Sequence, residues 1–305
     1  MSSFLARYNA AAVATKSVLC MGLDPTKDHL PPQFDRGNLI EDLRSYLYAL
    51  LRIAAKRVPV VKPQVAYYEA MGVEGMALLC WLEEAALELG LLCILDAKRS
   101  DIGETMAAYA KAPWISGADA CTFNPYLGPT FIPGWLEWAA RGRCAISMVL
   151  TSNPEADQLQ LQPLKSGLLV YEHMAQLTSG WNNEVLERTD GKGCIGAVVG
   201  ATYPEQATGC RELLGDHVLT LTPGYGAQGG GAKGAVIAVP NSMGQIVGVV
   251  NSSRGLTRDS WLDKATRQPK PGDPLEHIVA AVDAANAELN AALTAKLGRD
   301  PYAAN

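Results

Sequence analysis

The feature that most constrains the fold is a series of eight short apolar runs, each rich in β-forming residues and each followed by sequence with helical spacing. The runs are apolar throughout and do not alternate, which is typical of parallel strands covered on both faces. Eight such β/α units predict a (β/α)8 TIM barrel of the α/β class. An open doubly wound sheet is the second possibility, although it usually has fewer strands. The runs occupy residues 17–24, 58–64, 91–98, 118–125, 144–152, 194–202, 217–224 and 245–254.

The chain length and the spacing of these runs favour one domain. A chain of 305 residues lies within the range of single-domain barrels, so we expect residues 1–305 to form one barrel domain. Residues 75–89 are typical of one of its helices, with Gly90 as the expected C-cap. Residues 153–193 form a longer connection and predict a helix plus an extended excursion. Residues 274–297 predict a C-terminal helix that closes the barrel.

Composition and charge exclude several classes of partner. Apolar residues make up 48% of the chain and charged residues 19%, as in a soluble globular protein with a large core. The net charge is −5 and no Lys/Arg-rich run occurs, so we expect no nucleic-acid partner. We find no signal-peptide pattern and no stretch that could span a membrane. Seven scattered cysteines without a C-x-x-C pair indicate buried, reduced thiols and a cytoplasmic protein.

Polar side chains gather where the predicted strands end, and in a barrel of this kind the carboxyl ends of the strands form the active site. Side chains alternate along a strand, so Asp96 and Lys98 should share one face, with Asp101 in the following loop or first helical turn. Asp24 ends the first strand, and Lys62 interrupts the second. The fifth strand ends in three polar residues, Thr151, Ser152 and Asn153.

The ordinary explanation of Asp96, Lys98 and Asp101 is a solvated strand end followed by an acidic helix start. Lys62 weakens that explanation, because a lysine among buried strand residues needs a charged partner or a role in proton transfer. Two lysines and two acids that converge on one barrel mouth would keep the amines protonated and the carboxylates ionised. We therefore favour a fixed array of charges in an active site.

A second candidate is the glycine-rich segment LTPGYGAQGGG, residues 221–231, after the seventh run. Residues 224–229 match G-x-G-x-x-G, but the next run offers no acidic residue for a ribose, so a dinucleotide site is a poor interpretation. A phosphate loop fits better, because the loops after strands seven and eight usually hold phosphate in such barrels. Arg254, just after the eighth run, could bind phosphate oxygens. The alternative is a flexible glycine turn beside a surface arginine.

Other chemistry finds little support. The four histidines, His29, His173, His217 and His277, lie far apart and lack the spacing of metal ligands or of a triad. Neither a G-x-S-x-G elbow nor a G-x-x-x-x-G-K-[ST] loop occurs. We therefore expect no metal site built on histidines and no catalytic triad.

Short motifs occur along nearly the whole chain, in the order of the predicted strands. They are GLDP (22–25), VKPQVAYYE (61–69), LDAKRSDIGET (95–105), TFNPYLG (122–128), LTSNP (150–154), VVGAT (198–202), TPGYGAQGG (222–230) and SSRG (252–255). Together, these motifs resemble the orotidine 5′-phosphate decarboxylase family, specifically its longer bacterial-type branch (type 2). The resemblance implies conversion of orotidine monophosphate to uridine monophosphate and CO2 in pyrimidine biosynthesis, without a cofactor, through a carbanion at C6.

The resemblance implies roles for the charged residues. Asp24 and Lys62 would hold ribose hydroxyls, and Lys62 would also bond to the acids. Asp96 would face the substrate carboxylate, and Lys98 would donate the proton to C6. Preorganised charge would then stabilise the carbanion in place of a cofactor.

The resemblance also implies a homodimer with shared active sites, because in this family the acid matching Asp101 and the threonine matching Thr105 enter from the neighbouring subunit. Ser152 would read the pyrimidine edge. Gln228 and Arg254 would bind the 5′-phosphate together with backbone amides of the glycine loop.

Two other functions stay open. A Mg²⁺-dependent sugar-phosphate decarboxylase or aldolase of the same superfamily also uses D-x-K-x-x-D, but such relatives carry an acid where Lys62 stands. An inactive nucleotide-phosphate binding module would have lost a charged residue, and every expected one is present.

Overall fold

The structure is a computed structural model that describes residues 2–112, 115 and 117–303. Eight parallel strands pair in chain order, and β1 pairs with β8 to close the barrel. The predicted (β/α)8 fold is therefore confirmed, together with the order of its strands. Most strands are shorter than the runs that predicted them, because the polar residues at the run ends lie in loops. The strands are β1 (Leu19–Leu23), β2 (Val60–Pro63), β3 (Leu92–Arg99), β4 (Ala120–Phe123), β5 (Cys144–Leu150), β6 (Cys194–Val199), β7 (Thr220–Thr222) and β8 (Gly248–Ser252).

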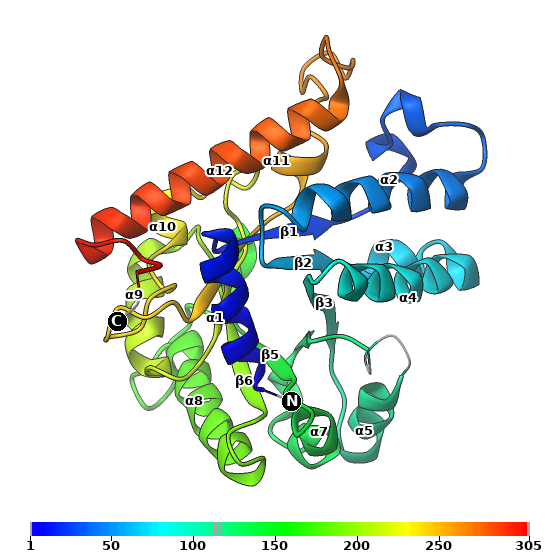
Figure 1. Ribbon diagram of the computed structural model, residues 1–305. Coiled ribbons are helices and arrows are strands. Elements are labelled where there is room, and N and C mark those ends of the chain that lie inside the picture. The colour runs from blue at the N-terminus through cyan, green and yellow to red at the C-terminus, as the bar shows by residue number, and fades with distance from the viewer. Residues whose placement is uncertain (1, 113–114, 116, 304–305) are drawn as a thin grey trace.

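Helices surround the barrel and cover the outer face of the strands (Figure 1). Apart from the last three residues of β3, the strands are buried along almost their whole length, which explains their continuous apolar sequence. The helices are α1 (Phe4–Thr15), α2 (Leu39–Ala54), α3 (Val65–Glu69), α4 (Gly72–Glu88), α5 (Gly103–Lys111), α7 (Phe131–Ala139), α8 (Val170–Arg188), α9 (Pro204–Leu214), α10 (Ala232–Ala235), α11 (Arg254–Thr257) and α12 (Pro274–Leu297), with short 3-10 turns η1 (Lys27–His29), η2 (Pro32–Phe34), η3 (Pro125–Leu127) and η4 (Pro154–Gln158).

The two helices singled out from the sequence are present. α4 ends with Leu89 as its C-cap, and Gly90 follows with a φ of 75°, a left-handed conformation that glycine adopts without strain. The C-cap is thus one residue earlier than predicted. α12 has the predicted bounds, and its N-cap Asp273 accepts a hydrogen bond from the backbone N–H of Leu275 at 3.0 Å.

α1 closes the amino end of the barrel. Its apolar face, Phe4, Tyr8 and Ala12, is buried. The Tyr8 hydroxyl donates to the carbonyl oxygen of Gly248, where β8 begins. This end of the barrel is thus covered by a helix, and the carboxyl end of the strands is the usual place for a ligand in such barrels.

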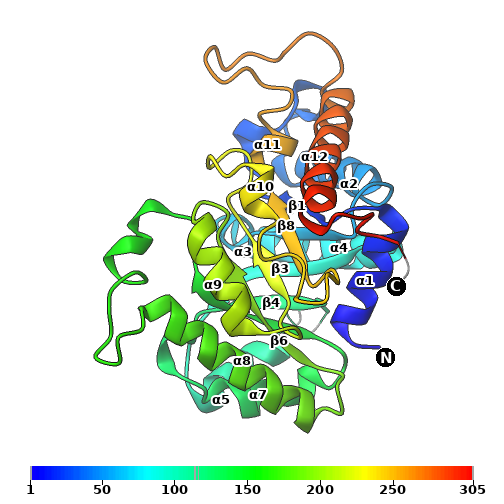
Figure 2. The same cartoon turned by 90° about the vertical axis from the view of Figure 1, so that its left-hand side faces the viewer.

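Two long connections project from the barrel (Figure 2). One spans residues 151–169 between β5 and α8 and contains η4; the other spans residues 258–273 before α12. The polar residues 182–188 belong to α8, so the irregular part of the connection after β5 precedes this helix. No helix in the described part of the chain is long and apolar enough to cross a membrane.

Candidate active site

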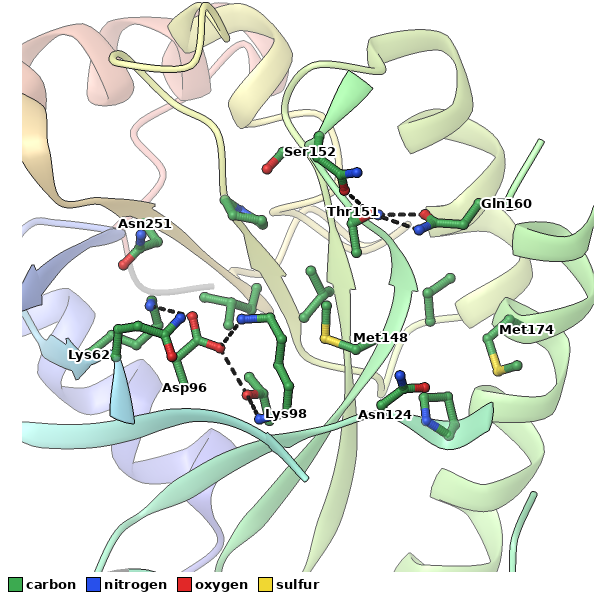
Figure 3. A pocket seen from close by; sticks show the side chains of 18 of the residues that line it. Lys62, Asp96, Lys98, Asn124, Met148, Thr151, Ser152, Gln160, Met174 and Asn251 are labelled. Atoms are coloured by element: carbon green, nitrogen blue, oxygen red, sulfur yellow. Dashed lines mark hydrogen bonds and ion pairs between the residues drawn. The ribbon is translucent and has the colours of Figure 1, made fainter. Parts of the chain in front are cut away.

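A cavity of about 620 Å³ opens at the carboxyl ends of the strands. Charged residues from the ends of β1 to β3 form one wall together with Asn251 of β8, and polar and apolar residues from β5 to β7 form the other (Figure 3). Six of the predicted site residues line this cavity: Asp24, Lys62, Asp96, Lys98, Ser152 and Gln228.

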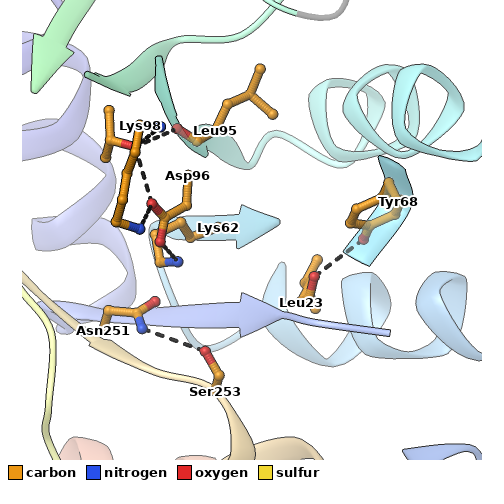
Figure 4. Close-up of polar contacts among 9 residues, drawn as sticks. Leu23, Lys62, Tyr68, Leu95, Asp96, Lys98, Asn251 and Ser253 are labelled. Atoms are coloured by element: carbon orange, nitrogen blue, oxygen red, sulfur yellow. Dashed lines mark hydrogen bonds and ion pairs between the residues drawn. The ribbon is translucent and has the colours of Figure 1, made fainter. Parts of the chain in front are cut away.

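Asp96 lies between the two lysines (Figure 4). The Nζ of Lys62 is 2.6 Å from its Oδ2, and the Nζ of Lys98 is 2.5 Å from its Oδ1. Thr122 on β4 donates its hydroxyl to the same Oδ1 at 3.0 Å. The side chain of Lys62 is 5% exposed and that of Lys98 is 44% exposed, so Lys62 is fixed inside the wall while Lys98 reaches into the cavity.

The end of β3 departs from a regular strand. Its register against β4 shifts between Leu95 and Arg99, and Lys98 has a φ of 49°, in the left-handed region. The backbone N–H of Lys98 donates to the hydroxyl of Thr122 at 3.1 Å, which supports this conformation. Strain of this kind is often found at functional sites. Simple alternation predicts the proximity of Asp96 and Lys98 but misses the irregular backbone.

The charges in this wall stabilise one another. Burial opposes ionisation of Asp96, but the ammonium groups of Lys62 and Lys98 outweigh it and hold the pKa of Asp96 well below its usual range. Burial alone would lower the pKa of Lys62, yet Asp96 and Asp24 raise it above its ordinary value. Both Asp96 and Lys62 are therefore ionised at neutral pH.

Asp24 follows β1 and lines the cavity beside this array. Its Oδ1 is buried and has no hydrogen-bond partner among the described residues, so it is free to accept from a ligand hydroxyl. Its backbone carbonyl is bonded to Nδ1 of His29 at 3.2 Å. This contact gives His29 a role in the loop after β1 that its isolated position in the sequence does not reveal.

Ser152 and Gln228 join the two loops on the other side. The hydroxyl of Ser152, after β5, donates to Oε1 of Gln228 in the glycine loop at 2.7 Å. Glycines make the approach possible: a Cβ on Gly200 or Gly224 would lie 2.9 Å from an atom of Ser152. Inside the loop, the N–H of Gly226 and the N–H of Gly230 donate to loop carbonyls, so these amides are already engaged.

Three predicted site residues do not line this cavity: Asp101, Thr105 and Arg254. Asp101 lies between β3 and α5, where its Oδ1 accepts from the N–H of Ile102 at 2.8 Å. Thr105 is exposed on α5, and Arg254 is exposed at the start of α11.

The structure adds residues that the motifs did not single out. Thr122 bonds to Asp96. Asn251 on β8 lines the cavity, and its buried Oδ1 has no hydrogen-bond partner in the part of the chain that the structure describes. Arg99 forms an ion pair with Glu69, and its guanidinium stacks over Tyr109 at 5.6 Å. Thr122 and Asn251 could have been noticed as polar residues inside apolar runs. The pairing of Arg99 with Glu69 could not, because these residues are distant in sequence and no local pattern links them.

Comparison with known proteins places this arrangement in a family. The chain matches the family model of the orotidine 5′-phosphate decarboxylase / HUMPS family over residues 17–268. A curated orotidine 5′-phosphate decarboxylase from Rhodopirellula baltica is 39% identical over 274 residues, which cover 83% of this chain and 88% of the relative. The chain belongs to this family.

Solved structures agree with this assignment. A structure from Toxoplasma gondii superposes with a TM-score of 0.81 at 25% identity and covers 97% of this chain and 98% of its own. The structure of Leishmania donovani OMP decarboxylase gives a TM-score of 0.69 at 26% identity, covering 93% of this chain and 98% of its own. Similarity over nearly complete chains extends the assignment to the whole barrel.

The donor set bears on the metal-dependent alternative. Within the described residues, no group of three or more His, Cys, Asp or Glu side chains is arranged to hold a metal ion. Lys62 and Lys98 occupy both oxygens of Asp96, which a hard cation would need as ligands. Two ammonium groups in this position do not suit a magnesium site.

Proposed function

We propose that this cavity converts orotidine monophosphate to uridine monophosphate and CO2, with Lys62, Asp96 and Lys98 as the chemical array. The family model and the curated relatives support this activity, which makes the chain a carboxy-lyase of pyrimidine biosynthesis. The observation that carries the site assignment is the carboxylate of Asp96 bonded to both lysines in the wall of the cavity.

In the proposed reaction, the bond between C6 and the carboxylate carbon breaks, CO2 leaves, and the electron pair stays on C6. The ammonium of Lys98 stabilises this charge and donates one proton to C6, which leaves a neutral amine. Asp96 fixes the position of Lys98 and faces the substrate carboxylate. Lys62 is buried and bonded to Asp96, so it neutralises this carboxylate and can offer a further N–H donor to the ribose.

Nucleotide binding follows from the rest of the cavity. The buried, unpartnered Oδ1 of Asp24 suits a ribose hydroxyl, and Ser152 suits the edge of the pyrimidine. Gln228 and Arg254 would bind the 5′-phosphate, with Arg254 moving in from its exposed position. The N–H groups of Gly226, Gly229 and Gly230 are engaged within the loop, so other backbone amides of the loop would share the phosphate with these two side chains.

A single assay tests the activity and the metal-dependent alternative together. The purified protein should convert orotidine monophosphate, seen as a loss of substrate absorbance with formation of uridine monophosphate, and the rate should be unchanged in EDTA. Protein that binds the nucleotide without releasing CO2 would favour an inactive binding module. A rate lost in EDTA and restored by Mg²⁺ would favour the sister activity.

We also propose a homodimer in which Asp101 and Thr105 serve the partner's site. Their position outside the cavity of their own chain, on the loop and helix that follow β3, supports this arrangement. Lys98→Ala and Asp101→Ala proteins are each expected to be inactive alone. After subunit exchange, an equal mixture should recover about a quarter of wild-type activity, because half of the dimers carry one intact site. Absence of recovery after confirmed exchange would contradict shared sites.

The remaining proposals concern organisation. Residues 1–305 would form one domain of the longer, type 2 branch, with residues 151–169 as its excursion. Seven free thiols, six of them buried, support a cytoplasmic protein.

A further inference from the structure

The excursion after β5 sends one side chain back into the cavity. Gln160 lies past the end of η4 and lines the cavity on the side opposite Lys98 (Figure 3). Its backbone N–H donates to the carbonyl of Ala156 at 2.7 Å, and its carbonyl accepts from the N–H of Tyr171, in the first turn of α8, at 2.9 Å. The backbone of Gln160 is therefore fixed to two helical elements.

The side-chain amide of Gln160 grips Thr151, the residue before Ser152. Oε1 accepts from the backbone N–H of Thr151 at 2.8 Å, and Nε2 donates to the Thr151 hydroxyl at 2.7 Å. The Thr151 hydroxyl in turn donates a hydrogen bond to Oδ1 of Asn153 at 2.7 Å. Since a backbone N–H can only donate, the orientation of the amide is fixed. Glutamine suits this position because its neutral amide can donate and accept at the same time at the end of a long side chain.

This grip completes the immobilisation of Ser152. Gly200 and Gly224 approach Ser152 so closely that a Cβ on either would lie 2.9 Å from one of its atoms. The Ser152 carbonyl accepts from the hydroxyl of Thr202 at 3.0 Å. The segments that follow β6 and β7 thus contact Ser152 from two sides, and Gln160 holds the preceding residue, Thr151.

We propose that Gln160 is a positioning residue for pyrimidine recognition: it holds the Thr151–Ser152 peptide so that the Ser152 hydroxyl and backbone face the base while bridging to Gln228. The proposal rests on the proposed function, because it takes the base to lie against Ser152. It also gives the excursion a purpose, which is to deliver one amide to the site.

The test replaces Gln160 with methionine, which has a similar length and no hydrogen bonds. Gln160→Met should raise the KM for orotidine monophosphate about tenfold, with kcat within about threefold, because it loosens binding without touching the reacting atoms. Thr151→Val, which removes only the hydroxyl half of the grip, should raise KM about threefold. Gln160→Glu keeps the acceptor for the Thr151 N–H and should restore part of the loss.

The matched control is Gln162→Met. Gln162 belongs to the same excursion, is exposed, and donates its amide to the carbonyl of Asp157 at 2.7 Å, away from Thr151. This variant should leave KM unchanged. An equal rise in KM for Gln162→Met would show that any disturbance of the excursion has the same effect, and would overturn the proposal.

A double-mutant cycle with Ser152→Ala tests whether Gln160 acts through Ser152 or affects binding independently of it. If Gln160 acts through Ser152, Gln160→Met should add less than about twofold to the KM of Ser152→Ala. A full tenfold addition would overturn the proposal, as would an unchanged KM in the single variant. Should Gln160→Met fold poorly, the same cycle is run with Thr151→Val.

Equilibrium binding of uridine monophosphate separates a failure of the proposed activity from a failure of the inference about Gln160. Wild-type protein that binds this nucleotide but has no turnover would contradict the proposed activity, while the Kd values of the variants would still report on Gln160. A wild-type protein that binds no uridine monophosphate would contradict the inference about Gln160 as well.

Discussion

At each end of the strands, one carboxylate of this barrel lies between two cations. At the carboxyl end, Asp96 bonds to Lys62 and Lys98. At the amino end, Asp119 just before β4 bonds to Arg7 of α1 and to Arg143, whose Nη1 lies 2.7 Å from its Oδ1. The arrangements look alike, but the cations differ. Arginine does not give up its proton in proteins, whereas lysine can.

The surroundings differ as well. Asp119 also accepts the backbone N–H of Cys93 at 2.9 Å, and Arg7 also donates to the carbonyl of Gly142 at 2.9 Å, so this cluster ties α1 to the loops that precede β4 and β5. Asp96 and its lysines face a cavity instead. We infer that the same charge pattern stabilises the fold where it links chain segments, and that it serves the proposed reaction where a lysine faces a cavity.

The largest expected effect comes from removing the transferable proton. Lys98→Ala should lower kcat/KM for orotidine monophosphate by at least about 10³-fold, because charge stabilisation and proton donation are lost together. The melting temperature should change little, since Lys98 is half exposed. Steady-state kinetics and calorimetry measure both quantities.

The counterpart at the amino end is Arg143→Ala, which should lower the melting temperature and spare kcat. If Lys98→Ala protein kept substantial turnover, or Arg143→Ala lost it without unfolding, the contrast between the two ends would be wrong.

The next effect is on stability. Asp119→Asn leaves two guanidinium groups beside a neutral amide, and the Asp119 side chain is 7% exposed, so the free energy of unfolding should fall by about 3–5 kcal/mol. Urea denaturation measures the loss. Asp96→Asn should also lose stability, because it leaves the buried ammonium of Lys62 without its carboxylate. The two variants should differ in activity: kcat should be lost in Asp96→Asn and kept in folded Asp119→Asn. Loss of kcat in folded Asp119→Asn protein would remove the distinction between the clusters.

The sequence predicts the charge cluster at the carboxyl end but not the one at the amino end. Asp96, Lys98 and Lys62 stand out because charges interrupt or end apolar runs, and barrel topology brings strand ends together. Asp119 could not be recognised in this way, because its partners Arg7 and Arg143 are distant in sequence and lie in ordinary helix and loop contexts.

Backbone irregularity and loop paths also escaped prediction. The left-handed φ of Lys98 depends on a hydroxyl from the neighbouring strand, and the grip of Gln160 on Thr151 depends on how the excursion folds back. Neither leaves a periodic signal in the sequence. Long connections have no repeating pattern from which their path could be inferred.

The smallest expected effect is a pH dependence of stability that arises from Glu83, beside the amino-end cluster. Glu83 on α4 is 7% exposed, and its Oε1 has no hydrogen-bond partner among the described residues. Burial, followed by the charge of Asp119, raises the pKa of Glu83 to about 9. The folded protein therefore keeps this proton at neutral pH, while the unfolded chain releases it above its ordinary value of 4.5. Stability should fall as pH rises from about 4.5 to about 9.

Glu83→Gln replaces this carboxyl with a neutral group of the same shape and should remove that contribution. The variant should melt close to the wild type near pH 5 and a few degrees higher, on the order of 2–4 °C, near pH 8. Glu88→Gln, on the exposed side of the same helix, is the control and should show no such trend. A Glu83→Gln variant that is less stable at every pH would mean that Glu83 is ionised and paired in the folded state. The amino end would then hold a second carboxylate neutralised by arginine, and the likeness between the two ends of the barrel would be weaker than the bonds around Asp119 indicate.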